Sequence, residues 1–543
     1  MKRRLVAMIL LTAFAVTACG TDAAPDRGSL SDRIGKEEDA PTEAPTEAPT
    51  EAPTEAPAEG GEPTPQGTIE PVAYDGEVRP LQIAIDTEYD GWSSDDWNYS
   101  AHIQAPEITV EEDGFDALAK SAHSYGRSLQ EFAKNNDLPD MINMCQEMQA
   151  SDPEPENGVY MVSEYTTTVA RADSTVTSFL TTQYVDYAGA HPGTVITTKN
   201  FDSMTGDALD IYSVVESDQI DGLPELIADS LIEKYGEEPF YDADNLAGTI
   251  DDTLGMNSDL VFTVDYFGIT FYFSPYELAP YAFGAQTVTF RYEDYPDLVK
   301  DVYQQTADNY IYPLDPYDSN TLPDGRELDL KITTFGEEYE EGYAIETSLD
   351  GNHASYEIYE AFDMVPWLVH CDDRDYLYLK WSTYNDYTLI SVCDLNGDTV
   401  GKPEDFYGSF MGSPTDPENL KIYNRGDLLS TVGMYRYYTV GKDGMPEPKT
   451  DYFIISSELS ITLKQDMTFE CRDDFDAPEN AVEENVRKGT KLTFYAENDD
   501  EGWVDLTLPD GRFVRVYVDS SDYPRTVEGI DMDDVFADLF WAG

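Results

Sequence analysis

Positive charge is scarce in this sequence of 543 residues. It contains 33 lysines and arginines against 108 aspartates and glutamates, which gives a formal net charge of −75. A protein that binds nucleic acid needs cationic side chains to neutralise phosphates, and docking on anionic lipid through a basic patch needs them too. The composition therefore argues against a nucleic-acid partner and favours a cationic one.

Histidine and cysteine are also rare, with five residues of each. No two histidines lie within four residues of one another, and no two cysteines have the spacing of a zinc site. The Gly-x-Ser-x-Gly turn of serine hydrolases and the Gly-x-x-x-x-Gly-Lys phosphate loop are both absent. We therefore expect no metal ion, no cofactor and no enzymatic activity. The alternative, a cell-wall hydrolase with an unrecognised carboxylate pair, stays open.

No run of apolar residues reaches the length of about 20 that spans a bilayer. The apolar stretch at 5–16 follows a basic start, Lys2-Arg3-Arg4, and precedes Val16-Thr17-Ala18-Cys19. This pattern resembles the signal and lipobox of bacterial lipoproteins. We expect residues 1–18 to be a signal peptide. A lipid on Cys19 would then anchor the chain at the extracytoplasmic face of a Gram-positive-type cell membrane.

The next segment, 19–68, has no apolar periodicity. It contains a Pro-Thr-Glu-Ala repeat at 41–57. Proline favours an extended backbone, and the repeated glutamates repel one another. We expect a disordered tether that carries the folded residues away from the lipid.

From residue 69 onward the pattern becomes globular. Spacing of apolar residues predicts helices at 113–135, capped by Asp113, at 139–148 and at 223–235. Alternation predicts irregular strands at 83–110, strands at 158–171 and 174–187, and a strand or hairpin at 260–273. Helices and strands are interspersed without βαβ regularity, so we expect an α+β fold for this region.

The pattern changes in the second half of the chain. Short strands separated by Asp324-Gly325, Asp350-Gly351, Asn396-Gly397 and Asp443-Gly444 predict an all-β domain at 306–455, including a hairpin formed by 376–387 and 388–395. Strands at 492–496, 503–508 and 513–518 resemble a small Src-homology-3-type barrel, which we place at 456–520. The acidic tail at 521–543 is expected to pack its aromatic residues against this β-barrel.

Two motifs carry a family resemblance. The first is Tyr-Ala-Gly-Ala-His-Pro-Gly at 187–193, and the second is Phe-Tyr-Phe-Ser-Pro-Tyr-Glu-Leu-Ala-Pro-Tyr-Ala at 271–282. Together they resemble the extracellular domain of RsiV-type anti-sigma factors and the domains that precede the catalytic domain of PdaC-type peptidoglycan deacetylases. The resemblance implies an α+β fold in two parts, 69–198 and 199–305. For the RsiV-type branch it also implies binding of c-type lysozyme, a cationic protein.

The chain departs from both families. It shows neither the sigma-binding segment and membrane-spanning helix of the anti-sigma factors nor the metal-site motif of the deacetylases. We therefore expect only the binding role to carry over.

The candidate contact residues lie in these two motifs. Tyr276 and Tyr281, with His191 and Tyr187, are candidates for partner binding, because tyrosine is enriched at interface hot spots. Ser274 and Glu277 have the spacing of a helix N-cap and its capping box. Cys371 and Cys393 form our preferred disulfide in an exported chain, with four reduced thiols as the alternative.

These observations predict a lipid-anchored extracellular binding protein of the bacterial cell envelope, which recognises a cationic protein such as lysozyme. The alternative, besides the enzyme, is an accessory lipoprotein that binds peptidoglycan through the C-terminal barrel.

Overall fold

The described part of the chain is mostly β-sheet, with a few helices and several sheets. The computed structural model describes residues 76–155, 157–255, 260–316, 319–336, 342–383, 387–457, 459–521 and 523–541. The expected signal peptide, Cys19 and the expected tether lie outside these residues. All described residues belong to one of the two units into which the chain divides.

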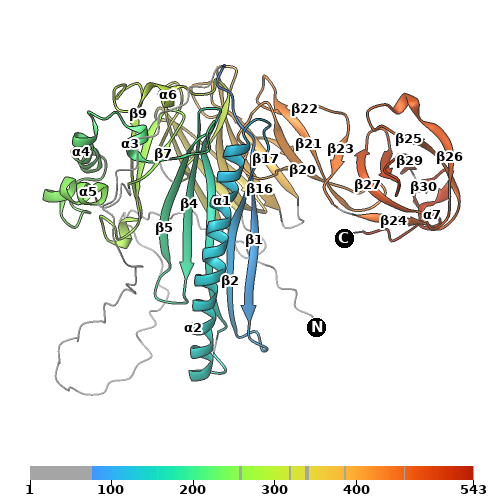
Figure 1. The fold of residues 1–543 in the computed structure, drawn as a ribbon, viewed down its shortest axis with the longest axis horizontal. Coiled ribbons are helices and arrows are strands. Elements are labelled where there is room, and N and C mark those ends of the chain that lie inside the picture. The colour runs from blue at the N-terminus through green and yellow to red at the C-terminus, as the bar shows by residue number, and fades with distance from the viewer. Residues whose placement is uncertain are drawn as a thin grey trace. The chain divides into compact units, whose positions relative to one another are not determined.

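The first sheet contains six strands in sequence order (Figure 1). They are β1 (Ile83–Ser93), β2 (Tyr99–Val110), β3 (Val159–Ala172), β4 (Val176–Asp186), β5 (Gly193–Asp202) and β6 (Ala208–Leu209). The strands predicted at 158–171 and 174–187 are confirmed as β3 and β4, and 83–110 forms a regular hairpin. β2 and β3 are parallel, whereas the other neighbours pair antiparallel.

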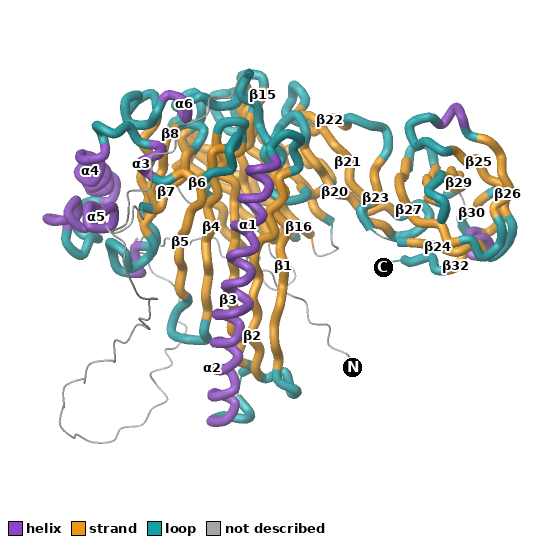
Figure 2. The backbone as a smooth tube through the Cα atoms, in the orientation of Figure 1, coloured by secondary structure: helices purple, strands orange, loops and turns teal. Residues whose placement is uncertain are grey.

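A helical crossover joins the parallel strands, as parallel pairing requires. It consists of α1 (Asp116–Phe132), a π-helical turn (Ala133–Asp137) and α2 (Leu138–Ser151), which cover one face of the first sheet (Figure 2). Both predicted helices are confirmed. The predicted cap is wrong, because the N-cap is Phe115 and Gly114 (φ 90°) turns the chain after Asp113.

Gly126 allows the crossover to approach the sheet closely. A Cβ atom at this position would lie 3.1 Å from the carbonyl oxygen of Pro106 and 3.2 Å from the backbone nitrogen of Ile108. The buried side chains Leu118 and Ala122 then reach the sheet.

None of the helices in the described ranges is long and apolar enough to cross a membrane.

Residues 211–304 surround a separate core. The elements are α3 (Ile211–Val214), α4 (Leu223–Tyr235), α5 (Leu246–Gly255), β7 (Val261–Val264), β8 (Gly268–Phe273), β9 (Gln286–Arg291) and α6 (Asp301–Gln304). The helix at 223–235 and the hairpin at 260–273 are confirmed. α5 was not predicted, because its glycine and threonines are weak helix formers. Its buried residues Leu246, Ile250 and Leu254, spaced by four, hold it on the core.

A fully buried arginine joins this part to the first sheet. The Nε atom of Arg171 on β3 donates to Asp173 Oδ2 at 2.7 Å. Its Nη atoms donate to the carbonyl oxygens of Asp265 (3.3 Å), Tyr303 (2.6 Å) and Gln305 (2.6 Å). The side chain is 0% exposed. Burying a guanidinium is costly unless its donors are satisfied, so these contacts fix the two parts together.

β7 lies beside β5 without strand pairing to it. Asn200 Nδ2 donates to the Phe262 carbonyl oxygen at 2.8 Å, and the Phe262 amide donates to Thr198 Oγ1 at 3.1 Å. The Val264 amide donates to Ser178 Oγ at 3.0 Å. Polar side chains of β4 and β5 therefore satisfy the backbone of β7.

The next part consists of two antiparallel sheets, and no helix occurs in the described residues of 306–455, as expected. One sheet has the order β10-β15-β16-β17-β18, with β10 (Tyr310–Pro313), β15 (Ala361–Cys371), β16 (Arg374–Thr383), β17 (Thr388–Asp394) and β18 (Glu404–Tyr407). The other contains β11 (Ser319–Thr321), β12 (Glu327–Phe335), β13 (Gly342–Leu349) and β14 (Asn352–Tyr359). The predicted hairpin is confirmed as β16 and β17.

Three of the four turn dipeptides have the expected positive φ, at Gly325, Gly351 and Gly444. The tight turn predicted at Asn396-Gly397 is wrong. The Asn396 side chain donates to the Asp375 carbonyl oxygen at 2.9 Å, which holds a longer loop between β17 and β18.

The C-terminal part belongs to a 14-stranded sheet. Its strands are β19 (Ser409–Phe410), β20 (Leu420–Gly426), β21 (Val432–Val440), β22 (Pro446–Pro448), β23 (Phe453–Ile455), β24 (Ser460–Leu463), β25 (Met467–Arg472), β26 (Val482–Val486), β27 (Lys491–Asn498), β28 (Trp503–Thr507), β29 (Phe513–Asp519), β30 (Thr526–Val527), β31 (Ile530–Asp531) and β32 (Phe536–Ala537), with α7 (Met532–Val535). β23 pairs with both β21 and β27, so the sheet continues across residue 456.

The three strands predicted in the C-terminal part are confirmed as β27, β28 and β29. The sheet there curves as a half-barrel. Val535 and Phe536 of the acidic tail are buried in its core, as expected, whereas Phe540 and Trp541 are exposed.

The disulfide preferred from the sequence is wrong. Cys145, Cys371, Cys393 and Cys471 are all free and buried. β16 lies between the strands that carry Cys371 and Cys393. Cys371 packs in the core with Tyr376 and Tyr378, whereas Cys393 packs in the core with Leu377 and Leu379. The two thiols therefore lie on opposite faces of the sheet.

Glu497 on β27 is a buried acid without a partner. It is 0% exposed, and neither carboxyl oxygen has a hydrogen-bond partner among the described residues. Burial, followed by the nearby carboxylates of Asp499 and Asp427, raises the pKa of Glu497 to about 9. Glu497 is therefore protonated in the folded chain at neutral pH.

Replacing Glu497 with Gln should increase stability relative to the wild type as the pH rises. In the unfolded chain this acid ionises near its ordinary value of 4.5, and in the folded chain only near pH 9. Between these values the unfolded state binds fewer protons. Ionisation of Glu497 therefore lowers the free energy of unfolding of the wild type by up to about 1.4 kcal/mol per pH unit, whereas Gln at this position makes no such contribution. Urea unfolding across this window measures the difference. Glu483→Gln, at an exposed strand position, is the control. A pH-independent difference for Glu497→Gln would contradict the prediction.

Candidate functional site

Three of the four candidate contact residues meet at one place on the surface. His191 lies in the loop between β4 and β5, and Tyr276 and Tyr281 lie in the segment between β8 and β9, where Tyr281 begins a 3-10 turn (Tyr281–Phe283). The His191 ring stacks on Tyr281, with centroids 4.5 Å apart, and lies 6.1 Å from the Tyr276 ring. The two tyrosine rings are 5.7 Å apart. We call these three residues the aromatic cluster.

Hydrogen bonds determine the orientation of the histidine. Its Nδ1 atom lies 3.0 Å from the Pro192 carbonyl oxygen, which can only accept, so Nδ1 carries a proton. In the neutral ring Nε2 then accepts, and the Tyr276 hydroxyl, 3.1 Å away, donates to it. This tautomer is assigned from the hydrogen-bond network. The cluster is accessible, since Tyr276 is 53% exposed and His191 is also exposed.

The backbone around Tyr276 forms a turn and not the start of a helix. Tyr276 has φ of 73°, in the left-handed region that a side chain disfavours. The helix start predicted from Ser274 and Glu277 is therefore wrong, because a left-handed residue cannot continue a right-handed helix. The segment forms a turn instead, in which the Tyr276 amide donates to the Ala279 carbonyl oxygen at 3.0 Å.

Ser274 and Glu277 nevertheless have structural roles. The Ser274 amide donates to Glu277 Oε2 at 2.8 Å, as in half of a capping box. The Ser274 hydroxyl accepts from the Ile196 amide at 3.0 Å and thereby ties the turn to β5. This bond brings Tyr276 and Tyr281 towards the loop that carries His191.

Tyr187, the fourth candidate, has a different environment. It is 41% exposed, and its neighbouring charges are Asp137 in the π-helical turn and Asp140 in α2. Burial, followed by these two carboxylates, raises the pKa of its phenol. Tyr187 therefore lies on the helix side of the first sheet and makes no ring contact with the aromatic cluster among the described residues.

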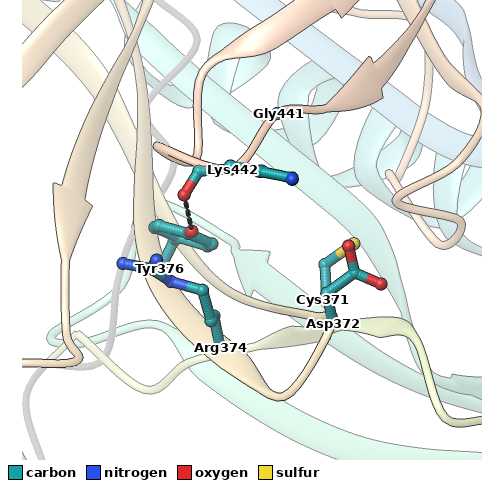
Figure 3. Close-up of a pocket in the computed structure, with 6 residues that line it drawn as sticks. All are labelled: Cys371, Asp372, Arg374, Tyr376, Gly441 and Lys442. Atoms are coloured by element: carbon teal, nitrogen blue, oxygen red, sulfur yellow. Dashed lines mark hydrogen bonds between the residues drawn. The ribbon is translucent and has the colours of Figure 1, made fainter.

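A small pocket of about 180 Å³ lies elsewhere, between the β15–β16 and β21–β22 turns (Figure 3). It is lined by Cys371, Asp372, Arg374, Tyr376, Gly441 and Lys442. Small-molecule sites typically measure about 300–1,000 Å³. Burial, followed by nearby carboxylates, of which Asp372 comes first, raises the pKa of the Cys371 thiol to about 11, so at neutral pH it is not the thiolate that a nucleophile requires. The aromatic cluster is the better candidate site.

No group of three or more histidine, cysteine, aspartate or glutamate side chains could hold a metal ion in the ranges that the structure describes. The chemistry of the aromatic cluster is that of recognition. It offers exposed ring faces, a phenol and an imidazole, which contact cations and apolar groups.

The family comparison concerns the part that carries Tyr276 and Tyr281. The model of a family described as "Protein of unknown function (DUF3298)" matches residues 210–293. The chain contains a DUF3298 domain. This domain extends from the residue before α3 to just beyond β9, and its match names no catalytic family. His191 and the first sheet precede the DUF3298 domain.

Two solved structures are similar to this chain. One is a member of the DUF3298 family from Bacteroides fragilis, with 14% identity and a TM-score of 0.34. The other is a DUF3298 family protein from Pseudomonas aeruginosa, with 14% identity and a TM-score of 0.27. Each similarity covers 41% of this chain and 96% of the other. A search of the curated proteins found no match.

Sequence reasoning missed the residues that assemble the site. Ser178, Thr198 and Asn200 bind the backbone of β7, and they look like ordinary polar strand residues in the sequence. Arg171 did carry a signal. It is the one cation among apolar and threonine residues at 165–172, where a buried charge needs a partner.

Alkylation should show that the four described cysteines are thiols. With the chain unfolded in guanidinium and no reductant, iodoacetamide should label all four, because none is in a disulfide. In the folded chain at about pH 7.5, Cys371 should react slowly, since it is buried and its pKa is raised. Mass spectrometry of the labelled peptides measures both. If Cys371 and Cys393 are labelled only after reduction, the prediction is contradicted.

Proposed function

We propose that this chain is a lipid-anchored extracellular binding protein of the cell envelope, and that its aromatic cluster contacts a cationic protein of the c-type lysozyme class. One observation carries the proposal. Two motifs that are 85 residues apart at His191 and Tyr276 converge on one exposed surface, where their side chains are hydrogen-bonded. Both motifs belong to the resemblance to RsiV-type extracellular domains, and the DUF3298 domain includes the second.

Charge and side-chain chemistry support the same partner. A net charge of −75 steers cationic proteins to this chain and speeds association. Tyr276, which is exposed, and Tyr281, which is half-buried, then supply contact area with little loss of side-chain freedom, which is typical of binding hot spots. Steering by charge is screened beyond about 8 Å at physiological salt. Specific binding would therefore depend on the aromatic cluster.

The location of the protein is part of the proposal. The basic start, the short apolar stretch and Cys19 support export and lipid attachment, and the proline- and glutamate-rich segment supports a tether at the extracytoplasmic face. A Gram-positive-type envelope suits this arrangement. We also propose that the C-terminal half-barrel is of the Src-homology-3 type.

Peptidoglycan is a second candidate ligand, for the C-terminal part. Phe475, Tyr495 and Phe513 form a group of mutually contacting, half-buried rings, with centroids 4.8–5.6 Å apart. Aromatic faces of this kind can stack on sugar rings. If Tyr495→Ala reduces binding of the full chain to insoluble peptidoglycan, this function is supported.

Lysozyme binding should depend on the aromatic cluster. Tyr276→Gly suits this test better than Tyr276→Ala, because glycine tolerates the φ of 73°. Tyr276→Gly and Tyr281→Ala should each weaken binding of the full chain, purified in mild detergent, by about 1–2 kcal/mol, or roughly 5- to 30-fold in Kd. Calorimetry at about 0.15 M salt measures this.

Two controls separate contact from bulk charge. Tyr407→Ala removes a tyrosine that is 67% exposed and lies outside the cluster, and it should leave Kd unchanged. An unrelated chain of equal negative charge should bind lysozyme more weakly. If that chain binds lysozyme equally well, net negative charge alone accounts for the binding and the proposal fails.

Cys19→Ala should prevent membrane attachment, because only a thiol accepts the diacylglyceryl group. The variant should remain an unprocessed precursor of higher mass, whereas Cys145→Ala should be processed normally. Fractionation and mass spectrometry of both variants in a Gram-positive host measure this. A Cys19→Ala protein that migrates and fractionates like the wild type would refute the anchor.

A further inference from the structure

The face of the first sheet opposite the helical crossover carries a row of polar and aromatic side chains. Ser163 Oγ and Gln183 Nε2 both donate to Asp137 of the crossover, so these residues face the helices. Side chains alternate along a strand, so their neighbours Glu164 and Tyr184 face the other way. Tyr89 pairs with Gln104, Gln104 with Glu164, and Glu164 with Tyr184.

Glu164 lies at the centre of this face. It is half-buried, and in the part of the chain that the structure describes no cation or hydrogen-bond donor contacts its carboxylate. Burial raises its pKa. Burial, together with neighbouring carboxylates that include Glu164 in each case, also raises the pKa of the Tyr89, Tyr160 and Tyr184 phenols. Three tyrosines from three strands therefore share one face with an uncompensated carboxylate: Tyr184 is its cross-strand neighbour, Tyr89 lies two strands away, and Tyr160 lies four residues earlier in β3.

Histidine extends the aromatic surface without adding positive charge. The His102 ring stacks on Tyr160 with centroids 5.2 Å apart. Gly91 makes room for it, because a Cβ atom there would lie 2.6 Å from His102 Nδ1. Burial lowers the pKa of His102, so the ring is neutral at neutral pH.

Asp363 of β15 adds another carboxylate near Tyr89, and Lys380 lies beside Asp363.

We propose that Glu164, with Tyr89, Tyr160 and Tyr184, forms a subsite that accepts a lysine or arginine side chain of a cationic partner protein. This inference rests on the proposed function for the choice of partner. The site combines the two elements that bind an ammonium or guanidinium group. The ring faces attract the cation through their quadrupoles, and the half-buried carboxylate pairs with its charge.

The position of the subsite fits a partner that also covers the aromatic cluster. Tyr281 is among the groups close enough to affect the phenol of Tyr184. Tyr184 also pairs with Thr194, three residues after His191, so it lies beside the loop that carries His191 of the aromatic cluster. A neutral glycan would leave Glu164 uncompensated, whereas a basic side chain would neutralise it.

The test uses two probes on the full chain in mild detergent. One is c-type lysozyme, and the other is the peptide acetyl-Lys-Ala-Lys-Ala-Lys-amide, with its norleucine counterpart as the neutral control. Glu164→Gln keeps the shape and removes the charge, and Tyr160→Leu removes one ring. Each should weaken binding of the lysine peptide roughly tenfold. Glu483→Gln makes the same charge change at an exposed strand position and should have less than about a twofold effect.

The outcomes separate this inference from the proposed function. If Tyr276→Gly weakens lysozyme binding but Glu164→Gln affects neither probe, the subsite is refuted and the proposed function stands. If the wild type binds the lysine peptide through Glu164 but does not bind lysozyme, the subsite stands and the proposed partner fails. Equal losses in Glu164→Gln and Glu483→Gln would show bulk attraction and refute the subsite. Thermal unfolding should confirm that both subsite variants remain folded.

Discussion

The buried guanidinium of Arg171 is the constraint on which the arrangement of the candidate site depends. A charge without solvent must have its donors satisfied, and here Asp173, directly after β3, and three carbonyl oxygens satisfy them. Those carbonyls belong to Asp265 in the β7–β8 turn, Tyr303 in α6 and Gln305 directly after α6. Any other packing of the first sheet against residues 211–305 would leave part of the guanidinium unpaired. Asp173, the paired acid, also accepts the amides of Thr175 and Val176 and so shapes the β3–β4 turn.

Weaker contacts connect the parts around Arg171 to the candidate site on one side and to the all-β part on the other. Towards the site, side chains of β4 and β5 bind the backbone of β7, and Ser274 binds Ile196, so the loops that carry His191 and Tyr276 meet. Towards the all-β part, the Tyr266 ring stacks on Tyr310 at 4.2 Å, and Tyr310 stacks on His370 at 5.0 Å. His370 in turn binds Asp375 at 2.7 Å. The aromatic cluster is therefore built on loops that a polar and aromatic interior holds in place.

The sequence predicted local structure well where the signal is local. The helix at 223–235 and the β16–β17 hairpin follow from the periodicity of their own residues. The convergence of His191, Tyr276 and Tyr281 was expected only in the sense that their motifs suggested one binding surface. Their contact depends on bonds between residues far apart in the chain, such as Ser274 with Ile196. Such bonds produce no regular spacing of residue types that could be recognised in the sequence.

The errors have the same physical origin. The spacing of Ser274 and Glu277 is that of a helix cap, but the left-handed backbone at Tyr276 overrides it. Cys371 and Cys393 both lie on strands of one sheet, but β16 lies between those strands and the two thiols point to opposite faces. In each case the tertiary environment, which a single sequence does not display, decided between two local possibilities.

The scarcity of cations gives these interior contacts a functional consequence. Arg171 is fully buried, and Arg472 and Arg515 both bind the buried carboxylate of Asp505. These three arginines therefore neutralise buried carboxylates, in a chain with more than three acids for each base. The aromatic cluster, together with the subsite of Glu164, Tyr89, Tyr160 and Tyr184, then presents rings and a carboxylate to solvent. A surface of this chemistry gains most from a partner that supplies the positive charge itself, because each basic side chain it brings both satisfies a carboxylate and lies against a ring face.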